Sequence, residues 1–289
     1  MSMRFVELFY KPVSAFLGRW PFLKHNFIGR NIGYCYRFFF FNQKPEDEEV
    51  RFFSQNAERV NAAADMLADE KSKKIYLGMV KFRQTCDKKD YPFYLLKEAQ
   101  YFMKELKPCK DETFIDCGAY TGDTIYSFLR HCREYKQIIA FEPDSRAFEK
   151  LKAKYENNPR ITLINAGVYD KDGEILFSGT GDGRSHIITD NVENDSSRGI
   201  QVKTIDGLGS EKVSFIKMDV EGAELNALKG AKKTILRDKP KLAVCIYHSP
   251  DDMVRIPEYI HNLAPEYKLY VRHYGFIGET VLYAVMSRA

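Results

Sequence analysis

Apolar and polar residues follow two different patterns along this chain of 289 residues. From Thr113 onward, short apolar runs alternate with stretches of helical periodicity, which predicts a mainly parallel sheet with helices on both faces. The runs expected to be strands are 113–117, 138–142, 161–164, 213–218, 242–247, 267–272 and 280–286. The stretch 178–198 is rich in Gly, Ser, Asp and Asn, so it predicts a long mobile loop of the kind that often covers a binding site.

The first hundred residues have a different pattern. Apolar side chains from Phe5 to Trp20 recur at steps of three and four, which predicts a helix with an aromatic-rich face that ends at Pro21. Aromatic residues interleaved with basic ones continue to Phe41, and a mostly helical stretch follows. We therefore divide the chain into an N-terminal extension at 1–45, a helical cap region at 46–108 and an α/β domain at 109–289.

The N-terminal extension has two interpretations. Its aromatic face either packs on the α/β domain or on a second subunit, or it forms a peripheral patch that contacts anionic lipid or a lipid-linked glycan. Both interpretations stay open, and the second one would use residues 1–44, where basic residues outnumber acidic ones by seven to one.

Composition narrows the functional classes. An apolar content of 44% is enough for a full α/β core. The net charge is only +4 and its positive excess lies in the N-terminal extension, so we expect no nucleic-acid partner. The six cysteines form no C-x-x-C pair, which favours reduced thiols, a cytoplasmic location and no zinc site. Charged residues and prolines interrupt every apolar run, so we expect no signal peptide and no membrane span.

The most informative motif is a strand, a turn and a second strand. The segment Thr113–Thr124 reads TFIDCGAYTGDT, and 138–144 reads IIAFEPD, so an acid, Glu142, ends the second strand. In a βαβ unit, an acid at this place accepts the ribose hydroxyls of a nucleoside. The turn lacks the G-x-G-x-x-G spacing that seats a pyrophosphate on a helix N-terminus. This combination favours a nucleoside without phosphates, such as S-adenosylmethionine.

Together with two later segments, Asn165–Val168 (NAGV) and Lys217–Glu224 (KMDVEGAE), these motifs resemble the FkbM family of S-adenosylmethionine-dependent methyltransferases, from about Glu98 to the C-terminus. The resemblance implies a class I methyltransferase-like (Rossmann-like) fold, with a mainly parallel seven-stranded sheet that closes in an antiparallel hairpin. It also places 100–102 in a lid over the cofactor, although simple packing of a helix accounts for these residues equally well. The residues expected to bind S-adenosylmethionine are Asp116, Gly118, Ala119, Tyr120, Gly122, Thr124, Glu142, Pro143, Asn165, Ala166 and Asp219.

The candidates for catalysis follow the fourth and fifth strands. Ligands in open α/β sheets bind at the carboxyl ends of the strands, which is where Asp219, Glu221 and His248 lie. Methylation of an alkyl hydroxyl benefits from a base, and we expect His248 or Asp219 in that role. His273 and His186 are further candidates. The alternatives without catalysis are Glu221 and Glu224 as first-turn helix acids and His248 as a helix cap.

A metal is a weaker alternative at the same place. Asp219, Glu221 and His248 together would suit magnesium or manganese, since these metals accept oxygen ligands and an imidazole. Their spacing in the sequence does not demand a metal.

We therefore predict an S-adenosylmethionine-dependent methyltransferase that methylates a hydroxyl of a sugar, a glycan or a secondary metabolite. An NAD-dependent oxidoreductase is one alternative, although the turn at Gly118–Gly122 does not provide its pyrophosphate site. A non-catalytic, glycan- or membrane-associated protein on a methyltransferase fold is the other. The sequence names neither the acceptor nor the oligomeric state, and a homo-oligomer stays open.

Overall fold

The structure, a computed structural model, describes the chain in seven ranges: 44–92, 99–108, 110–179, 185–188, 197–209, 212–275 and 278–286. Between 177 and 198 it describes the backbone alone. The predictions made for residues 1–43 lie outside the described residues. Among the described helices, none is long and apolar enough to cross a bilayer.

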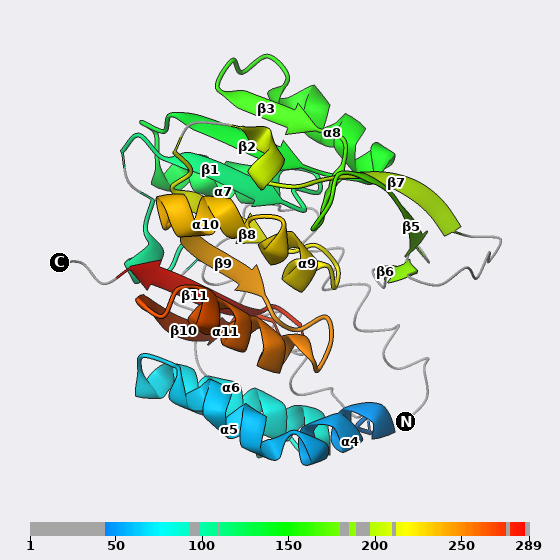
Figure 1. Cartoon of the computed structure of the whole chain (residues 1–289), viewed down its shortest axis with the longest axis vertical. Coiled ribbons are helices and arrows are strands. Elements are labelled where there is room, and N and C mark those ends of the chain that lie inside the picture. The colour runs from blue at the N-terminus through cyan, green and yellow to red at the C-terminus, as the bar shows by residue number, and fades with distance from the viewer. Residues whose placement is uncertain are drawn as a thin grey trace, which may run out of the picture.

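The main body is a seven-stranded sheet in the order β10-β11-β9-β8-β1-β2-β3 (Figure 1). Only β11 runs against its neighbours, and it forms a hairpin with β10 at one edge. The predicted seven-stranded, mainly parallel sheet with a closing hairpin is therefore confirmed. The strands are β1 (Thr113–Cys117), β2 (Gln137–Phe141), β3 (Ile161–Ile164), β8 (Phe215–Met218), β9 (Lys241–Cys245), β10 (Tyr267–His273) and β11 (Thr280–Met286).

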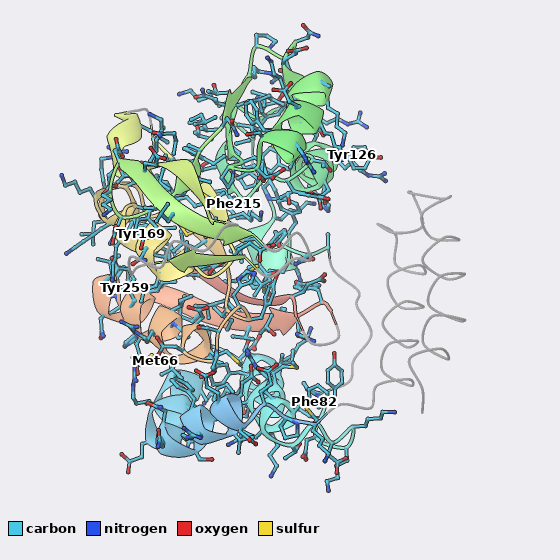
Figure 2. All side chains as sticks on the ribbon, turned by 90° about the vertical axis from the view of Figure 1, so that its right-hand side faces the viewer. Met66, Phe82, Tyr126, Tyr169, Phe215 and Tyr259 are labelled. Atoms are coloured by element: carbon cyan, nitrogen blue, oxygen red, sulfur yellow. The ribbon has the colours of Figure 1, made fainter. Side chains whose placement is uncertain are left out.

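The central strands are buried on both faces, because helices cover the sheet. All five residues of β1 and all four of β8 are buried. The rings of Phe114 on β1 and Phe128 on a covering helix stack 4.5 Å apart, and Phe215 on β8 (labelled in Figure 2) meets Phe114 edge-on. Apolar runs without alternation are typical of such doubly covered strands. The covering helices are α7 (Asp123–His131), α8 (Ser145–Tyr155), α9 (Glu224–Lys229), α10 (Lys232–Asp238) and α11 (Asp252–Leu263).

The residues before β1 form a helical layer beside the hairpin edge of the sheet (Figure 1). The backbone N–H of Ala68 donates to Leu269 on β10, and Ser72 Oγ accepts from the N–H of Val271. Arg272 pairs with Asp69 at 2.9 Å. These contacts satisfy part of the outer edge of β10, which would otherwise offer unpaired backbone groups. The elements are α4 (Asp47–Gln55), α5 (Ala57–Asp65), α6 (Glu70–Thr85) and the short η1 (Lys104–Leu106).

A second sheet connects β3 to β8, in the order β4-β7-β5-β6. Its strands are β4 (Gly167–Val168), β5 (Gly173–Gly179), β6 (Ser185–Ile188) and β7 (Ser197–Lys203), and η2 (Asp206–Leu208) follows. The prediction of one long loop at 178–198 is wrong, because β6 and the start of β7 lie inside it. Backbone pairing with β5 builds these strands, so they need no apolar run of their own, and an apolar run was the signal we used.

Candidate functional site

The turn after β1 uses its glycines for contacts within the chain. Gly118 has a φ of +79°, and a Cβ at this position would lie 1.9 Å from the carbonyl oxygen of Asp219. Gly122 has a φ of +84°, and its Cβ would lie 2.4 Å from the ring of Tyr155. Gly118 thus lets the ends of β1 and β8 meet, and Gly122 lets the turn pack on α8. Cofactor binding by Gly118 and Gly122 stays a prediction.

Glu142 lies at the end of β2 with both carboxylate oxygens held in place. Oε2 accepts the backbone N–H of Tyr120 at 2.7 Å, and Oε1 accepts that of Asp144 at 2.8 Å. Burial raises the pKa of Glu142, and these two hydrogen bonds oppose the rise. Glu142 does not cap α8, because Asp144 does so by accepting from the N–H of Ala147. Each oxygen of Glu142 has a second lone pair, so the carboxylate can still accept two ribose hydroxyls.

The residues predicted to lie near the adenine sit beside Glu142. The side-chain amide of Asn165 donates to the backbone oxygen of Glu142 at 2.8 Å. The other predicted cofactor residues differ in exposure. Tyr120 is 62% exposed and Pro143 is partly buried, whereas Ala119, Thr124 and Ala166 are buried. The ring of Tyr120 is thus open to a ligand, and cofactor binding by these residues stays a prediction.

Asp116 lies under the turn, not in the open site. It is fully buried, and its Oδ1 is 3.1 Å from Nζ of Lys217, which is equally buried. The ammonium of Lys217 also donates to the carbonyl oxygens of Gly118 at 2.7 Å and Cys117 at 3.1 Å. Burial lowers the pKa of Lys217, but the charges of Asp116 and Asp219 outweigh this and keep the ammonium protonated. The pair therefore holds the turn from below. Lys217 was part of the KMDVEGAE motif but had no predicted role. A lysine inside a buried strand is rare unless it is paired, so its position indicates a buried partner.

Asp219 follows β8 directly and accepts hydrogen bonds from two tyrosines. The hydroxyl of Tyr101 donates to Oδ2 at 2.8 Å, and that of Tyr247 to Oδ1 at 3.2 Å. Burial raises the pKa of Asp219, but the charges of Lys217 and His248 and the bond from Tyr101 outweigh it, so the pKa lies below its ordinary value. Asp219 is thus held as a carboxylate. That 100–102 forms a lid stays a prediction. Tyr247 was not among the predicted site residues.

His248 lies just past the end of β9, between three carboxylates. Its Nδ1 is 2.9 Å from Oε1 of Glu224, and its Nε2 is 3.4 Å from Oδ1 of Asp219 and 3.6 Å from Oε2 of Glu221. Burial lowers the pKa of His248, but the three carboxylates, Glu224 first, outweigh burial and raise it to about 9. His248 does not cap α11, where Ser249 and Asp252 exchange hydrogen bonds.

Glu224 is the acid of the first turn of α9, as one interpretation of the sequence expected. Its carboxylate is fully buried, and it accepts the backbone N–H of Val220 at 2.8 Å and that of Gly222 at 3.0 Å. These bonds close a turn in which Glu221 and Gly222 have φ values of +56° and +93°. The expectation of a first-turn acid is therefore confirmed for Glu224, but it did not include the contact with His248. A buried acid that closes its own turn and lies against a histidine is part of the site.

The other histidine candidates lie elsewhere. His273 is fully buried, with Nδ1 2.8 Å from the hydroxyl of Thr280 and Nε2 2.8 Å from the hydroxyl of Tyr91. Both ring nitrogens are therefore engaged within the hairpin and with the segment after α6. His186 lies on β6, and its side chain is outside the described residues.

The predicted metal ligands do come together. Asp219 and Glu221 face the same ring nitrogen of His248, and within the described part of the chain Asp219, Glu224 and His248 form a group whose ligand atoms lie within 4.8 Å of one another. An imidazole among carboxylates can hold a divalent cation or can itself carry a proton. Magnesium or manganese binding at this group stays a prediction.

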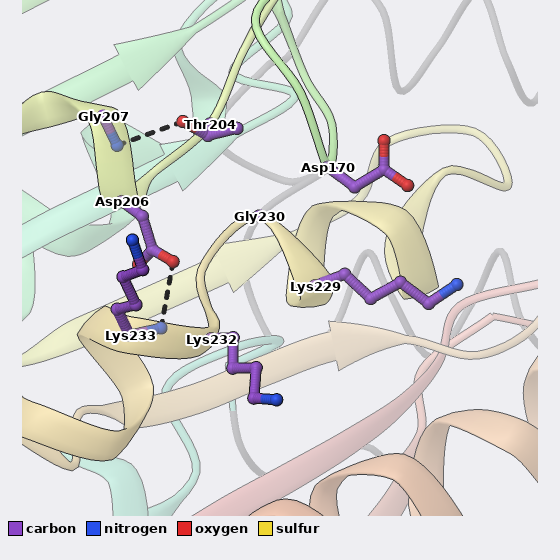
Figure 3. A pocket seen from close by; sticks show the side chains of 8 residues that line it. All are labelled: Asp170, Thr204, Asp206, Gly207, Lys229, Gly230, Lys232 and Lys233. Carbon is purple, nitrogen blue, oxygen red and sulfur yellow. Dashed lines mark hydrogen bonds between the residues drawn. The ribbon is translucent and has the colours of Figure 1, made fainter.

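A separate hollow of about 420 Å³ lies beside η2 and the start of α10 (Figure 3). The side chains of Asp206 and Thr204 in its lining bond to the backbone of the same chain. Asp206 accepts the backbone N–H groups of Lys233 and Thr234, and Thr204 Oγ1 accepts that of Gly207. None of the predicted site residues lines it. The hollow is lined by Asp170, Thr204, Asp206, Gly207, Lys229, Gly230, Lys232 and Lys233.

The fold and this edge of the sheet define an α/β methyltransferase of class I. The Methyltransferase FkbM domain family matches residues 116–277, which is more than half of the chain. The chain therefore belongs to the FkbM methyltransferase family, and the resemblance found in the sequence is confirmed.

Two known proteins are similar to this chain. The crystal structure of the methyltransferase FkbM from Methylobacillus flagellatus KT is 27% identical, with a TM-score of 0.67, over 81% of this chain and 60% of that chain. The 2-O-methyltransferase NoeI of Sinorhizobium fredii is 25% identical over 149 residues, which are 45% of this chain and 61% of NoeI. This chain thus matches only about three fifths of the length of either protein.

Proposed function

We propose that this methyltransferase uses S-adenosylmethionine to methylate a hydroxyl of a sugar, a glycan or a secondary metabolite. The observation that carries the proposal is the contact between two half-sites. Gly118 packs on the backbone of Asp219, whose N–H donates to the carbonyl oxygen of Cys117 at 3.1 Å. This contact joins the nucleoside half-site, formed by the turn and Glu142, to the acid–histidine half-site, formed by Asp219, Glu221 and His248.

The nucleoside half-site fits S-adenosylmethionine. Glu142 would accept the two ribose hydroxyls, and Asn165 lies where the adenine would start. The exposed ring of Tyr120 borders the same turn. S-adenosylmethionine supplies a methyl group on a sulfonium centre. Asp219 and Glu221 add negative charge on the side of its ammonium and sulfonium groups, which favours a cationic ligand.

The acid–histidine half-site would remove the proton of the acceptor. A hydroxyl attacks well only as its proton leaves, so a base beside the acceptor oxygen lowers the barrier. His248 suits this role better than Asp219, because the pKa of Asp219 is lowered and a carboxylate of low pKa is a weak base. The neutral form of His248 is the base, and its share grows as the pH rises toward the raised pKa of about 9. The acceptor oxygen forms a bond to the methyl carbon while the carbon–sulfur bond breaks, and the proton moves to Nε2 of His248.

The acceptor is a hydroxyl compound on three grounds. A base is of most use for a hydroxyl, since a neutral amine attacks without one. Carboxylates beside tyrosine rings, here Asp219 with Tyr101 and Tyr247, offer the hydrogen-bond acceptors and flat apolar surfaces that a sugar ring contacts. The name of one relative, a 2-O-methyltransferase, agrees with this chemistry.

Thermal-shift titrations test the cofactor. S-adenosylhomocysteine should raise the melting temperature of the full chain, and NAD should not, because a ligand that binds only the native state stabilises it. The variant Glu142→Gln should lose most of the shift, whereas Glu149→Gln, an exposed change on α8, should keep it. A shift with NAD alone would support the oxidoreductase instead. Cofactor binding without transfer of a labelled methyl group to any simple glycoside would support the non-catalytic alternative.

A further inference from the structure

We propose that Glu224 is the positioning residue of the proposed reaction: it fixes the tautomer of His248, so that Nδ1 carries a proton and Nε2 is left to accept one from the substrate. The inference rests on the proposed function for its catalytic meaning. It concerns a contact that the sequence analysis did not foresee, between the start of α9 and the end of β9.

The carboxylate of Glu224 is immobile in the site. Glu224 is fully buried, and its two oxygens accept the N–H groups of Val220 and Gly222, so the side chain cannot turn away from the histidine. The turn that supplies these donors contains the left-handed residues Glu221 and Gly222. Strained backbone of this kind persists where the surrounding structure holds it, and it is common at functional sites.

The two ring nitrogens of His248 have different surroundings. Nδ1 lies 2.9 Å from Glu224, a distance typical of a charge-assisted hydrogen bond. Nε2 lies farther from its carboxylates, at 3.4 Å from Asp219 and 3.6 Å from Glu221. Both nitrogens are buried without an aligned hydrogen bond among the described residues. Catalytic hydrogen bonds are often poorly aligned before the substrate binds and tighten in the complex.

The different surroundings of the two ring nitrogens determine which one carries the proton. A carboxylate accepts hydrogen bonds only, so Glu224 selects the tautomer with the proton on Nδ1. Nε2 then has a free lone pair when His248 is neutral, and it takes the proton of the acceptor hydroxyl. Glu224 stays ionised throughout and stabilises the imidazolium that forms. The proton is released from Nε2 after the methylated product leaves.

Other charged groups also face His248 and contribute to the electrostatic potential at its ring. Asp219 and Glu221 come from the segment after β8, and Asp252 comes from α11, where burial and then the charge of Glu224 raise its pKa to about 6. Lys217, on β8, lowers the pKa of Asp219, and Asp219 in turn faces His248. Glu224 has the strongest effect on His248 because it is the nearest carboxylate and is fully buried.

Nuclear magnetic resonance of the full chain with labelled histidine tests the inference without an acceptor. His248→Gln assigns the signal among the six histidines. In the wild type, the ring should show a proton on Nδ1 in the neutral form, because Glu224 can only accept at this nitrogen. In Glu224→Gln the side-chain amide can donate as well as accept, so the tautomer should become mixed. Glu224→Asp keeps the carboxylate but shortens the side chain, so it should fix the tautomer less well than the wild type does.

Three outcomes test the proposed role of Glu224. An unchanged tautomer in folded Glu224→Gln, judged by its melting curve against Glu149→Gln, would overturn the inference. A proton on Nε2 in the neutral wild type would also overturn it. With any acceptor glycoside that is turned over, and at a pH high enough to make His248 neutral in both proteins, Glu224→Gln should lower kcat by about 100-fold with little change in KM. Failure to bind S-adenosylhomocysteine would instead refute the proposed function and leave the histidine measurements intact.

Discussion

The buried pair of Asp116 and Lys217 offers a test of how the turn is held. Both side chains lack solvent exposure, and the ammonium also binds two carbonyl oxygens of the turn. Lys217→Met keeps most of the length of the side chain but removes the ammonium that lies beside the Asp116 carboxylate and donates to both carbonyls. Breaking a buried ion pair on one side costs about 3–5 kcal/mol. We therefore expect the unfolding free energy to fall by about that amount.

A double variant separates the interaction energy between Asp116 and Lys217 from the effects of the single changes. Asp116→Asn combined with Lys217→Met removes both charges, so it should lose less stability than Lys217→Met alone. Urea unfolding followed by circular dichroism measures Lys217→Met, Asp116→Asn, the double variant and the wild type. Lys150→Met, at an exposed lysine on α8, is the control. Two results would refute the reasoning. One is a loss below about 1 kcal/mol for Lys217→Met, which is the range of a surface pair. The other is additivity of the two single changes, which is the behaviour of sites that do not interact.

Three more predictions concern the same edge of the sheet. Gly118→Ala should lower the melting temperature and abolish the thermal shift with S-adenosylhomocysteine, because its Cβ would lie 1.9 Å from the oxygen of Asp219; a variant that melts and binds like the wild type would show that the turn can relax. The raised pKa of His248, about 9, contributes stability that is present in full below its unfolded value, about 6.5, and is lost as the pH rises through 9. Urea midpoints should therefore fall by the equivalent of about 3 kcal/mol across this window, and His248→Gln should remove that slope; an unchanged slope would move the titration to another group. Millimolar magnesium or manganese should leave the melting temperature unchanged, because protonated His248 already supplies positive charge between Asp219 and Glu221; a rise that His248→Gln abolishes would assign a metal site instead.

The sequence predicted the main sheet well for a physical reason. Strands such as β1 and β8 are buried on both faces, so their apolar runs are continuous and their ends stand out. The nucleoside turn and Glu142 were found because local geometry fixes their spacing within one βαβ unit. Asp219 and His248 could be placed at the same edge because the carboxyl ends of parallel strands meet there.

The second sheet could not be found in the same way. Strands β5 to β7 pair mainly with one another, and β5 is largely exposed at 173–176. A strand that buries little surface needs no apolar run, so its composition looks like that of a loop. Register and pairing partners are properties of the folded chain, and short-range patterns do not report them.

The inner contacts of the site were missed for a related reason. The pairs Lys217 with Asp116, Tyr101 with Asp219, and Glu224 with His248 join residues from different elements. A sequence shows that a lysine or glutamate lies in an apolar segment, but not which partner offsets the cost of burying it. The packing of Gly118 against Asp219 and of Gly122 against Tyr155 could not be foreseen for the same reason.

A crystal structure of the full chain with S-adenosylhomocysteine tests the proposed methyl-donor site most directly. We predict that both ribose hydroxyls donate to Glu142 and that the sulfur faces the space between Asp219 and Nε2 of His248. A ribose bound away from Glu142, or a sulfur that points away from His248, would contradict the proposed site.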